Sequence, residues 1–107
     1  MTHILHITTP ADWQAALEVG IYRADSLESE GFIHCSTAQQ MAATANRFYA
    51  GQSDLLLLHI DPQALAAELR WEMADGQDFP HIYGPINLDA VVEVEAFNPD
   101  ADGSFHY

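Results

Sequence analysis

The sequence predicts a small α+β domain in which a mixed, split β-sheet is covered by two main helices and one short helix. β-prone segments alternate irregularly with two well-bounded helical segments, a pattern that is typical of strands and helices packed as separate layers. The chain has 107 residues, enough for one hydrophobic core and little more. We therefore expect a single domain over residues 1–107 that ends in a polar, frayed tail over residues 98–107.

The first strand and the first helix are well marked. Residues 3–8 are rich in β-formers, and Thr9 followed by Pro10 is a helix N-cap with proline in the first turn. Gly20 stands where a left-handed residue would end that helix. The pattern predicts a strand over residues 3–8 and a helix over residues 10–19.

The next segments predict two short strands and the second main helix. Residues 21–23 and 32–35 are β-prone, and residues 25–31 between them are polar and turn-like. The run Ser36-Thr37-Ala38-Gln39 fits a capping box. The helix after it carries an apolar stripe at Met41, Ala45, Phe48 and Tyr49 and ends before Gly51.

The second half of the chain is mostly β-structure. The strands that we expect cover residues 54–60, 69–73, 79–83 and 91–97, and Glu93 and Glu95 lie on the wetter face of the last one. Asp61 and Pro62 begin a short helix over residues 62–67. Residues 74–78 form a loop, and Gly84-Pro85 forms a turn.

The strongly acidic composition limits the partners of the chain. Sixteen Asp and Glu residues face three arginines and no lysine, which gives a formal net charge of −13. Such a charge repels nucleic-acid backbones and anionic membranes, so we expect neither as a partner. The most apolar run, residues 55–60, is far too short to cross a bilayer. We expect a monomer or a small homo-oligomer.

The lone cysteine, Cys35, has no partner for an internal disulfide, and the N-terminal segment lacks the pattern of a signal peptide. These features predict a cytoplasmic protein. Cys35 and its neighbour His34 point to opposite faces of a strand, so Cys35 is interpreted as a buried structural thiol rather than a nucleophile. No His-x-x-x-His, His-Glu-x-x-His, Gly-x-Gly-x-x-Gly or P-loop motif occurs, and no metal site is predicted.

His34 and Ser36 are the first pair of candidate site residues. Strand alternation places both side chains on one face, and Ser36 begins a helix whose free N–H groups can hold a phosphate. The alternative is structural: Ser36 caps the helix and His34 is a hydrogen-bonded core side chain. In the first strand His6 and Thr8 share a face in the same way, and there the alternative is a histidine satisfied by the backbone.

A third candidate segment, residues 79–85, combines aromatic rings, an imidazole and a rigid backbone. His81, Tyr83 and Gly84 could form a wall on which a flat ligand stacks; alternatively the segment is a rigid turn that packs under the edge of the sheet. Glu72 is the carboxylate most suited to chemistry, because it lies between Trp71 and Met73 rather than in a solvated run.

These segments carry a resemblance that covers nearly the whole chain. His6-Ile7-Thr8, Trp13, the run of residues 31–36 and the run of residues 79–86 occur in this order in an uncharacterised bacterial family, the domain-of-unknown-function nine-five-two family. That family in turn resembles the ADP-ribosyltransferase-like fold and, within it, the RNA 2′-phosphotransferases. Those enzymes carry His-Gly-Thr and His-Leu-Ser where this chain has His6-Ile7-Thr8 and His34-Cys35-Ser36.

The resemblance implies a pocket for NAD or an ADP-ribose-like nucleotide. Catalytic roles would fall to His6, His34 and Glu72, and the cofactor would contact Thr8, Ser36, His81, Tyr83 and Gly84. The activity implied is ADP-ribosyl transfer or NAD glycohydrolysis, in which a carboxylate stabilises an oxocarbenium-like state. Two departures from the phosphotransferases matter: Ile7 replaces their middle glycine, and three scattered arginines on a chain of net charge −13 argue against an RNA substrate. Two alternatives are a non-catalytic nucleotide or small-molecule binding module and a metal-dependent hydrolase.

Overall fold

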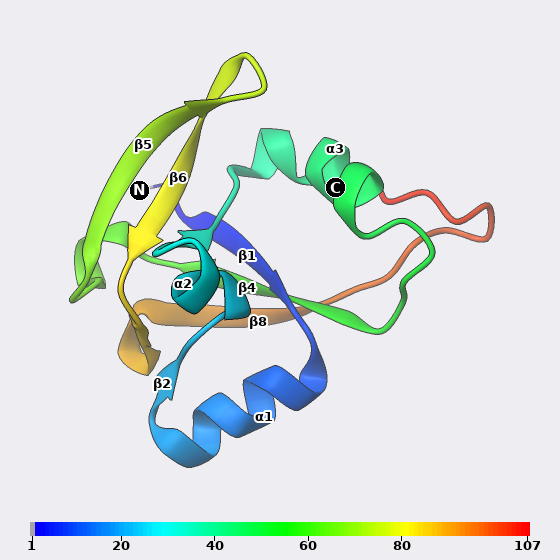
Figure 1. The fold of residues 1–107 in the computed structure, drawn as a ribbon. Helices are drawn as coiled ribbons and strands as arrows, with labels where there is room; N and C mark the ends of the chain where they lie inside the picture. The colour runs from blue at the N-terminus through cyan, green and yellow to red at the C-terminus, as the bar shows by residue number, and fades with distance from the viewer. Residues whose placement is uncertain (1) are drawn as a thin grey trace.

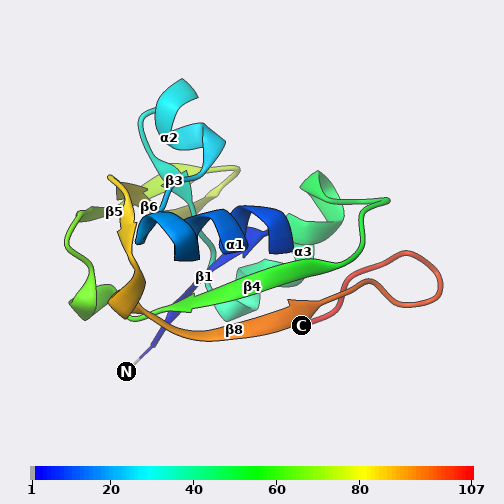
Figure 2. The same cartoon turned by 90° about the horizontal axis from the view of Figure 1, so that it is seen from below.

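The computed structural model describes residues 2–107 and contains three small β-sheets and three α-helices (Figure 1). The first sheet has the order β1-β4-β8, formed by Ile4–Thr8, Leu55–Ile60 and Val91–Phe97. Strand β4 lies at its centre, and its side chains are largely buried on both faces, as its run of leucines predicts. Seen from below, α1 and α3 lie beside this sheet (Figure 2).

The second three-stranded sheet has the order β3-β6-β5 and stands across the first one (Figure 1). Its strands are Ile33–His34, Gln77–Tyr83 and Glu68–Ala74. A two-stranded sheet, β2-β7, pairs Ile21–Tyr22 with Ile86–Asn87. A β-bridge joins the two larger sheets, because Leu5 and Ser36 exchange two backbone hydrogen bonds of 2.8 Å.

The small α+β architecture is confirmed, but the mixed sheet is not. Every strand pairing in residues 2–107 is antiparallel. The strands that follow α1 and α3 pair in other sheets than the strands that precede these helices, so the parallel component that we expected is missing. The split character of the sheet is real, since the single bridge at Leu5 and Ser36 is its seam.

Helix α1 spans Pro10–Val19 as predicted. The Thr9 hydroxyl accepts from the backbone N–H of Asp12 at 3.1 Å, and Gly20 has a left-handed φ of 99°. The second main helix, α3, spans Ala38–Phe48, and its predicted cap is wrong by one residue. The Thr37 hydroxyl, not that of Ser36, accepts from the Gln40 N–H, and the Gln40 side-chain carbonyl accepts from the Thr37 N–H. The cap moves because the backbone of Ser36 is held in the bridge to Leu5.

The short helices also differ from prediction. A five-residue helix, α2, spans Asp25–Ser29 where a turn was expected. The negative charges of Asp25 and Glu28 in its first turn interact favourably with the helix dipole, and Leu27 packs on the core. The helix predicted over residues 62–67 is only a 3₁₀ turn, Pro62–Ala64. The Asn87 side chain binds the carbonyl of Ala64 and the N–H of Ala66, which holds this segment extended.

The predicted loop over residues 74–78 is a tight hairpin between β5 and β6. Asp75 and Gly76 have φ values of 51° and 84°, as a two-residue turn with both central residues left-handed requires. Asp-Gly between two strands is a strong hairpin signature, and it was present in the sequence. The β5–β6 hairpin lies opposite α3 and forms one wall of the cavity described below.

The C-terminal tail is not frayed, contrary to expectation. Phe105 is 1% exposed and packs against Phe97, with ring centroids 4.9 Å apart. The side chain of Asn46 in α3 also binds both backbone groups of Phe105, at 2.7 and 2.9 Å. The tail therefore closes the core between α3 and the first sheet.

Buried side chains form two clusters on either side of the first sheet. One lies between that sheet and α1 and includes Tyr22, Ile33 and Ile82. The other lies under α3 and includes Met41, Ala45 and Phe105. In residues 2–107 no helix has the length and apolar character needed to cross a membrane.

The position of the α3 cap leads to a specific prediction. Thr37→Ala removes one partner of the Gln40 N–H and should lower the free energy of unfolding by about 1 kcal/mol. Thr37→Ser keeps the capping hydroxyl and is the matched control. Urea unfolding of both variants tests this, and equal stability of the two would place the cap elsewhere.

Candidate functional site

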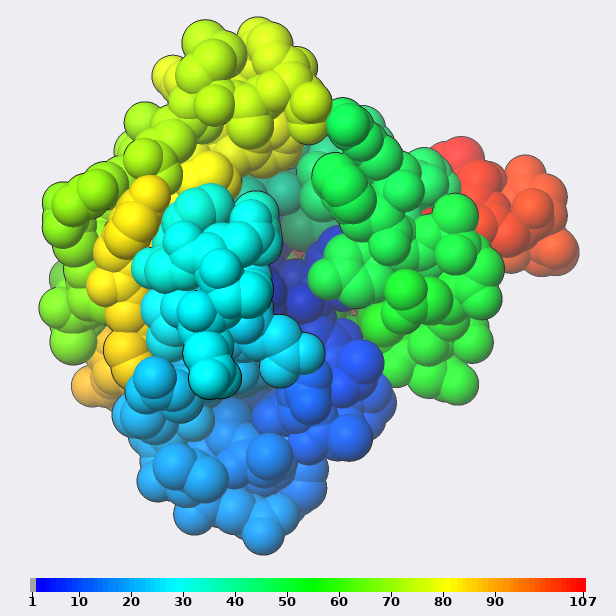
Figure 3. All heavy atoms as spheres, in the orientation of Figure 1, coloured from blue at the N-terminus to red at the C-terminus, as the bar shows by residue number. Residues whose placement is uncertain are grey.

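A cavity of about 690 Å³ lies between α3, the sheet β3-β6-β5 and strand β1. Figure 3 shows the hollow between the segment containing α2 and the helix α3, with atoms of β1 at its base. It is lined by His6, Ile7, Glu30, Phe32, His34, Cys35, Ser36, Met41, Thr44, Phe48, Tyr49, Met73, Ala74, Asp75, Phe79 and His81. Four predicted site residues, His6, His34, Ser36 and His81, are therefore brought together from three distant segments.

His6 is held rigidly at the base of this cavity. Its Nδ1 donates to the backbone carbonyl of His34 at 2.6 Å, and its Nε2 lies 2.8 Å from the hydroxyl of Tyr22. Because a carbonyl can only accept, the proton sits on Nδ1, and Nε2 of the neutral ring accepts from Tyr22. Burial lowers the pKa of His6 to about 4. His6 is therefore neutral near pH 7, and both of its nitrogens are occupied by the protein.

His81, Glu72 and Tyr83 form a hydrogen-bonded group on the inner sheet. Glu72 Oε1 lies 2.8 Å from His81 Nδ1 and accepts from the Tyr83 hydroxyl at 2.5 Å. The hydrogen bonds from Tyr83 and then His81 lower the pKa of Glu72, and the bond to Glu72 raises the pKa of Tyr83. Glu72 is thus an anion that accepts a hydrogen bond from His81 Nδ1, and this bond leaves Nε2 of His81 free to face the cavity.

Aromatic rings surround His81. Phe32 stacks on it with centroids 4.2 Å apart and an interplanar angle of 21°. His34 meets both Phe32 and His81 edge-on, at 4.8 and 5.4 Å. These side chains lie together because His34 and His81 are register partners in the β3–β6 pair.

His34 and Ser36 play different parts in the cavity. The His34 side chain is half exposed, and its Nε2 lies 3.0 Å from Glu30. Ser36 is buried and donates to the Thr44 hydroxyl at 3.2 Å. The expectation that Ser36 begins the helix is wrong, because Thr37 is the N-cap of α3. The argument that Ser36 holds a phosphate at a helix N-terminus therefore no longer applies.

The other four predicted site residues lie outside the cavity lining: Thr8, Glu72, Tyr83 and Gly84. The hydroxyl of Thr8 is buried and lies 2.9 Å from that of Tyr22. Gly84 packs against Ala67, whose Cβ lies 2.8 Å from where a side chain at Gly84 would begin. Tyr83 donates to Glu72 and contacts the cavity-lining ring of Phe32, with ring centroids 5.3 Å apart.

Sequence reasoning missed the cation at the edge of the cavity. Arg47, in α3, binds Asp75 of the β5–β6 hairpin at 2.7 Å, and its guanidinium lies 5.0 Å from the centre of the Phe48 ring. Asp75 and Phe48 both line the cavity. The Asp75-Gly76 turn could have indicated the hairpin, but its approach to α3 depends on tertiary packing.

Cys35 also lines the cavity and is almost completely buried. Burial raises the pKa of its thiol, so the thiol stays protonated near neutral pH. This agrees with the interpretation of Cys35 as a structural residue.

Taken together, the fold and this cavity define a small α+β protein with a preformed pocket of imidazole and phenyl rings. The sequence matches the family model described as "Protein of unknown function (DUF952)" over residues 7–94, and the chain belongs to this family. No protein with a curated description matches it.

Solved structures of one bacterial protein are similar over nearly the whole chain. The crystal structure of protein CC0527 from Caulobacter crescentus has a TM-score of 0.89 and 34% sequence identity, and the match covers 98% of this chain and 94% of that one. The solution NMR structure of CC0527 gives a TM-score of 0.85, also at 34% identity, and covers 99% and 93% of the two chains. The fold described above is therefore shared with CC0527.

Proposed function

We propose that the cavity binds a nucleotide of the NAD or ADP-ribose type. The observation that carries this proposal is the convergence of Phe32, His34 and His81 on one wall of the cavity. Flat rings of this kind stack on the π-face of a base or nicotinamide. A volume of about 690 Å³ also lies in the usual range for small-molecule sites.

Arg47 is the residue best placed to meet the phosphates. Its guanidinium and the Asp75 carboxylate are both about half exposed, so their ion pair contributes little by itself. A phosphate at the edge of the cavity can replace Asp75 and bind the Arg47 guanidinium through two oxygens. This contact supplies the positive charge that an otherwise acidic pocket lacks.

The chemistry that we propose is NAD hydrolysis or ADP-ribosyl transfer. The bond from the ribose C1′ to the nicotinamide nitrogen breaks, its electron pair leaves with nicotinamide, and water or another acceptor bonds to C1′. His81 Nε2 takes the proton of the acceptor, and Glu72 stabilises the resulting imidazolium through Nδ1. Glu72 is near the wall rather than in the lining, so it acts on the ribosyl cation at longer range.

The alternative is a binding module without turnover. One observation favours it: the Oε1 atom of Glu72 is engaged by both His81 and Tyr83, and Glu72 does not line the cavity. In this case the ligand would be bound in the same place and released unchanged.

Titration calorimetry with NAD and ADP-ribose tests the binding site. His34 and His106 form a matched pair, since each is an exposed histidine paired with one carboxylate, and only His34 lines the cavity. We expect His34→Ala to weaken binding about tenfold through the lost stacking surface, and His106→Ala to leave it unchanged. Equal effects of the two variants, or no binding of either ligand to the unmodified protein, would contradict the proposal.

Measuring the release of nicotinamide from NAD then distinguishes a catalytic site from a binding module without turnover. If the site is catalytic, Glu72→Gln should slow release at least about tenfold with little change in affinity. Binding without nicotinamide release, with or without an added nucleophile, identifies the non-catalytic module.

A further inference from the structure

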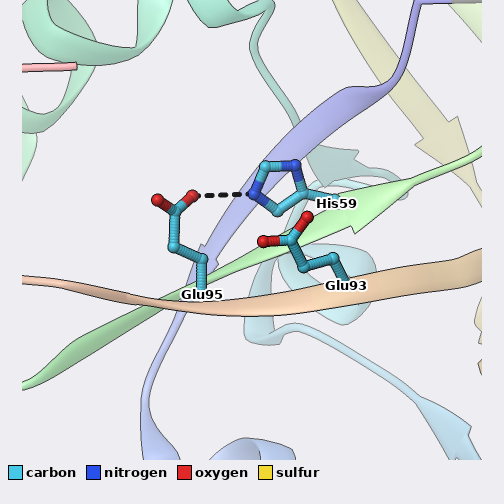
Figure 4. A group of neighbouring side chains, drawn as sticks. All are labelled: His59, Glu93 and Glu95. Carbon is cyan, nitrogen blue, oxygen red and sulfur yellow. Dashed lines mark hydrogen bonds and ion pairs between the residues drawn. The ribbon is translucent and has the colours of Figure 1, made fainter.

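A second cluster of chemically active side chains lies away from the cavity, on the first sheet. His59 projects from β4, and Glu93 and Glu95 project from β8 to the same side (Figure 4). His59 and Glu93 are register partners in the antiparallel β4–β8 pair, and Glu95 is two residues further along β8. Two hydrogen-bonded strands therefore fix the backbone of all three residues, and none of them lines the cavity.

The potential ligand atoms of the cluster are already close together. One donor atom from each residue lies within 4.8 Å of the other two, and His59 Nε2 is 2.8 Å from Glu95 Oε1. Ligand atoms around a tetrahedral zinc ion are separated by about 3.3 Å, given metal–ligand bonds of about 2.0 Å. The Glu93 side chain is exposed, so no packing contact prevents it from rotating toward the other two ligands.

The charges in this cluster are not balanced by the protein. Within residues 2–107, neither Glu93 nor Glu95 forms an ion pair with an arginine; Arg47 and Arg70 pair with Asp75 and Glu68 instead. Two carboxylates thus face one imidazole in a chain of net charge −13. A divalent cation would neutralise them.

Tyr107 completes the surroundings of the cluster. Its hydroxyl donates to Glu95 Oε1 at 3.0 Å. This hydrogen bond orients the Glu95 carboxylate. A hydrogen bond of this kind to a ligating carboxylate is a usual support for a metal site.

We propose that His59, Glu93 and Glu95 bind one divalent transition-metal ion of the zinc type. An imidazole nitrogen with two carboxylate oxygens suits zinc, whereas magnesium and calcium prefer sites made only of oxygen. Three protein ligands on a solvent-facing sheet leave one coordination position for water. The ion would join the edge strand β8 to the central strand β4, and its binding does not depend on the nucleotide proposal.

Equilibrium dialysis of metal-free protein against Zn²⁺ tests the site. We expect one ion to bind per chain, to raise the Tm, and to perturb the NMR signals of the His59 ring and of the β4 and β8 amides. Millimolar Mg²⁺ or Ca²⁺ should not displace it. Glu93→Gln is the principal variant, because Glu93 is exposed and its loss should leave the fold intact; we expect at least a tenfold loss of affinity.

His106→Gln is the matched control, since His106 forms an ion pair with one carboxylate, Asp100, and not with two. It should leave the affinity unchanged. His59→Gln and Glu95→Gln should weaken binding as Glu93→Gln does, with circular dichroism to show that each variant is folded. The proposal is overturned if Zn²⁺ does not bind, or if folded Glu93→Gln and His59→Gln bind it as well as His106→Gln does.

Discussion

Phe105→Ala is expected to lower the free energy of unfolding by about 3–5 kcal/mol, the usual cost of removing a buried phenyl ring. Phe105 is among the largest fully buried side chains of the molecule, although only two residues follow it in the sequence. Its ring fills the space between Phe97 and the residues under α3. A small domain is stable by only about 5–15 kcal/mol, so the variant should be close to unfolding at 25 °C.

Urea unfolding measures this effect, and Phe48→Ala is the matched control. Phe48 is 60% exposed, so its truncation should change stability by about 0.5 kcal/mol or less. Phe105→Leu should fall between the two because it restores most of the apolar volume. A Phe105→Ala variant as stable as Phe48→Ala would mean that the tail does not pack on the core in solution.

His6 should make the stability of the protein depend on pH in mildly acidic solution. The pKa of His6 is about 4 in the folded protein and 6.5 when it is exposed. Between these values the unfolded chain binds a proton that the folded protein excludes. The contribution of His6 is therefore complete above pH 6.5 and is lost as the pH falls toward 4, by about 2–3 kcal/mol at pH 4.5.

The test compares the unmodified protein with His6→Gln, because protonation of the many carboxylates also changes stability in acid. At pH 7.5 the variant should be the less stable protein, since glutamine does not reproduce both hydrogen bonds of His6. At pH 4.5 the free energy of unfolding of the unmodified protein, relative to that of the variant, should be lower than at pH 7.5 by about 2–3 kcal/mol. A difference that stays constant over this range, or a His6 ring that titrates near pH 6.5 by NMR, would show that His6 is not buried in the neutral form.

The elements that sequence reasoning located correctly are those with a local physical cause. Thr9, Pro10 and Gly20 define both ends of α1 without help from the rest of the chain. The run of leucines in β4 is buried on both sides, as its composition predicts. In each case the signal and the structure lie within the same few residues.

The errors arose where distant contacts decide the outcome. Asn87 holds residues 64–66 extended and shortens a helix that the cap at Asp61 had begun. The bridge to Leu5 moves the cap of α3 from Ser36 to Thr37. The tail looked unstructured because most of its residues are polar, and the groups that hold it, Asn46 and Phe97, lie far from it in the sequence.

The same distinction applies to the cavity. Three of its histidines could be selected from their sequence segments, because each lies on or beside a strand with other potential ligand groups. The contact of Arg47 with Asp75 and the stacking of Phe32 on His81 could not be selected, since they depend on how α3 and β3 approach the hairpin. The cluster at His59 was missed for the same reason: β4 and β8 are separated by some thirty residues, and only their pairing brings it together.

The central claim is that the cavity is a nucleotide site, and amide chemical-shift mapping during a titration with ADP-ribose tests it most directly. We predict saturable shifts concentrated in residues 32–36 and 79–83 and at Arg47, with none at His106 or in α1. Shifts that are absent, or that spread over the surface without saturating, would contradict the account.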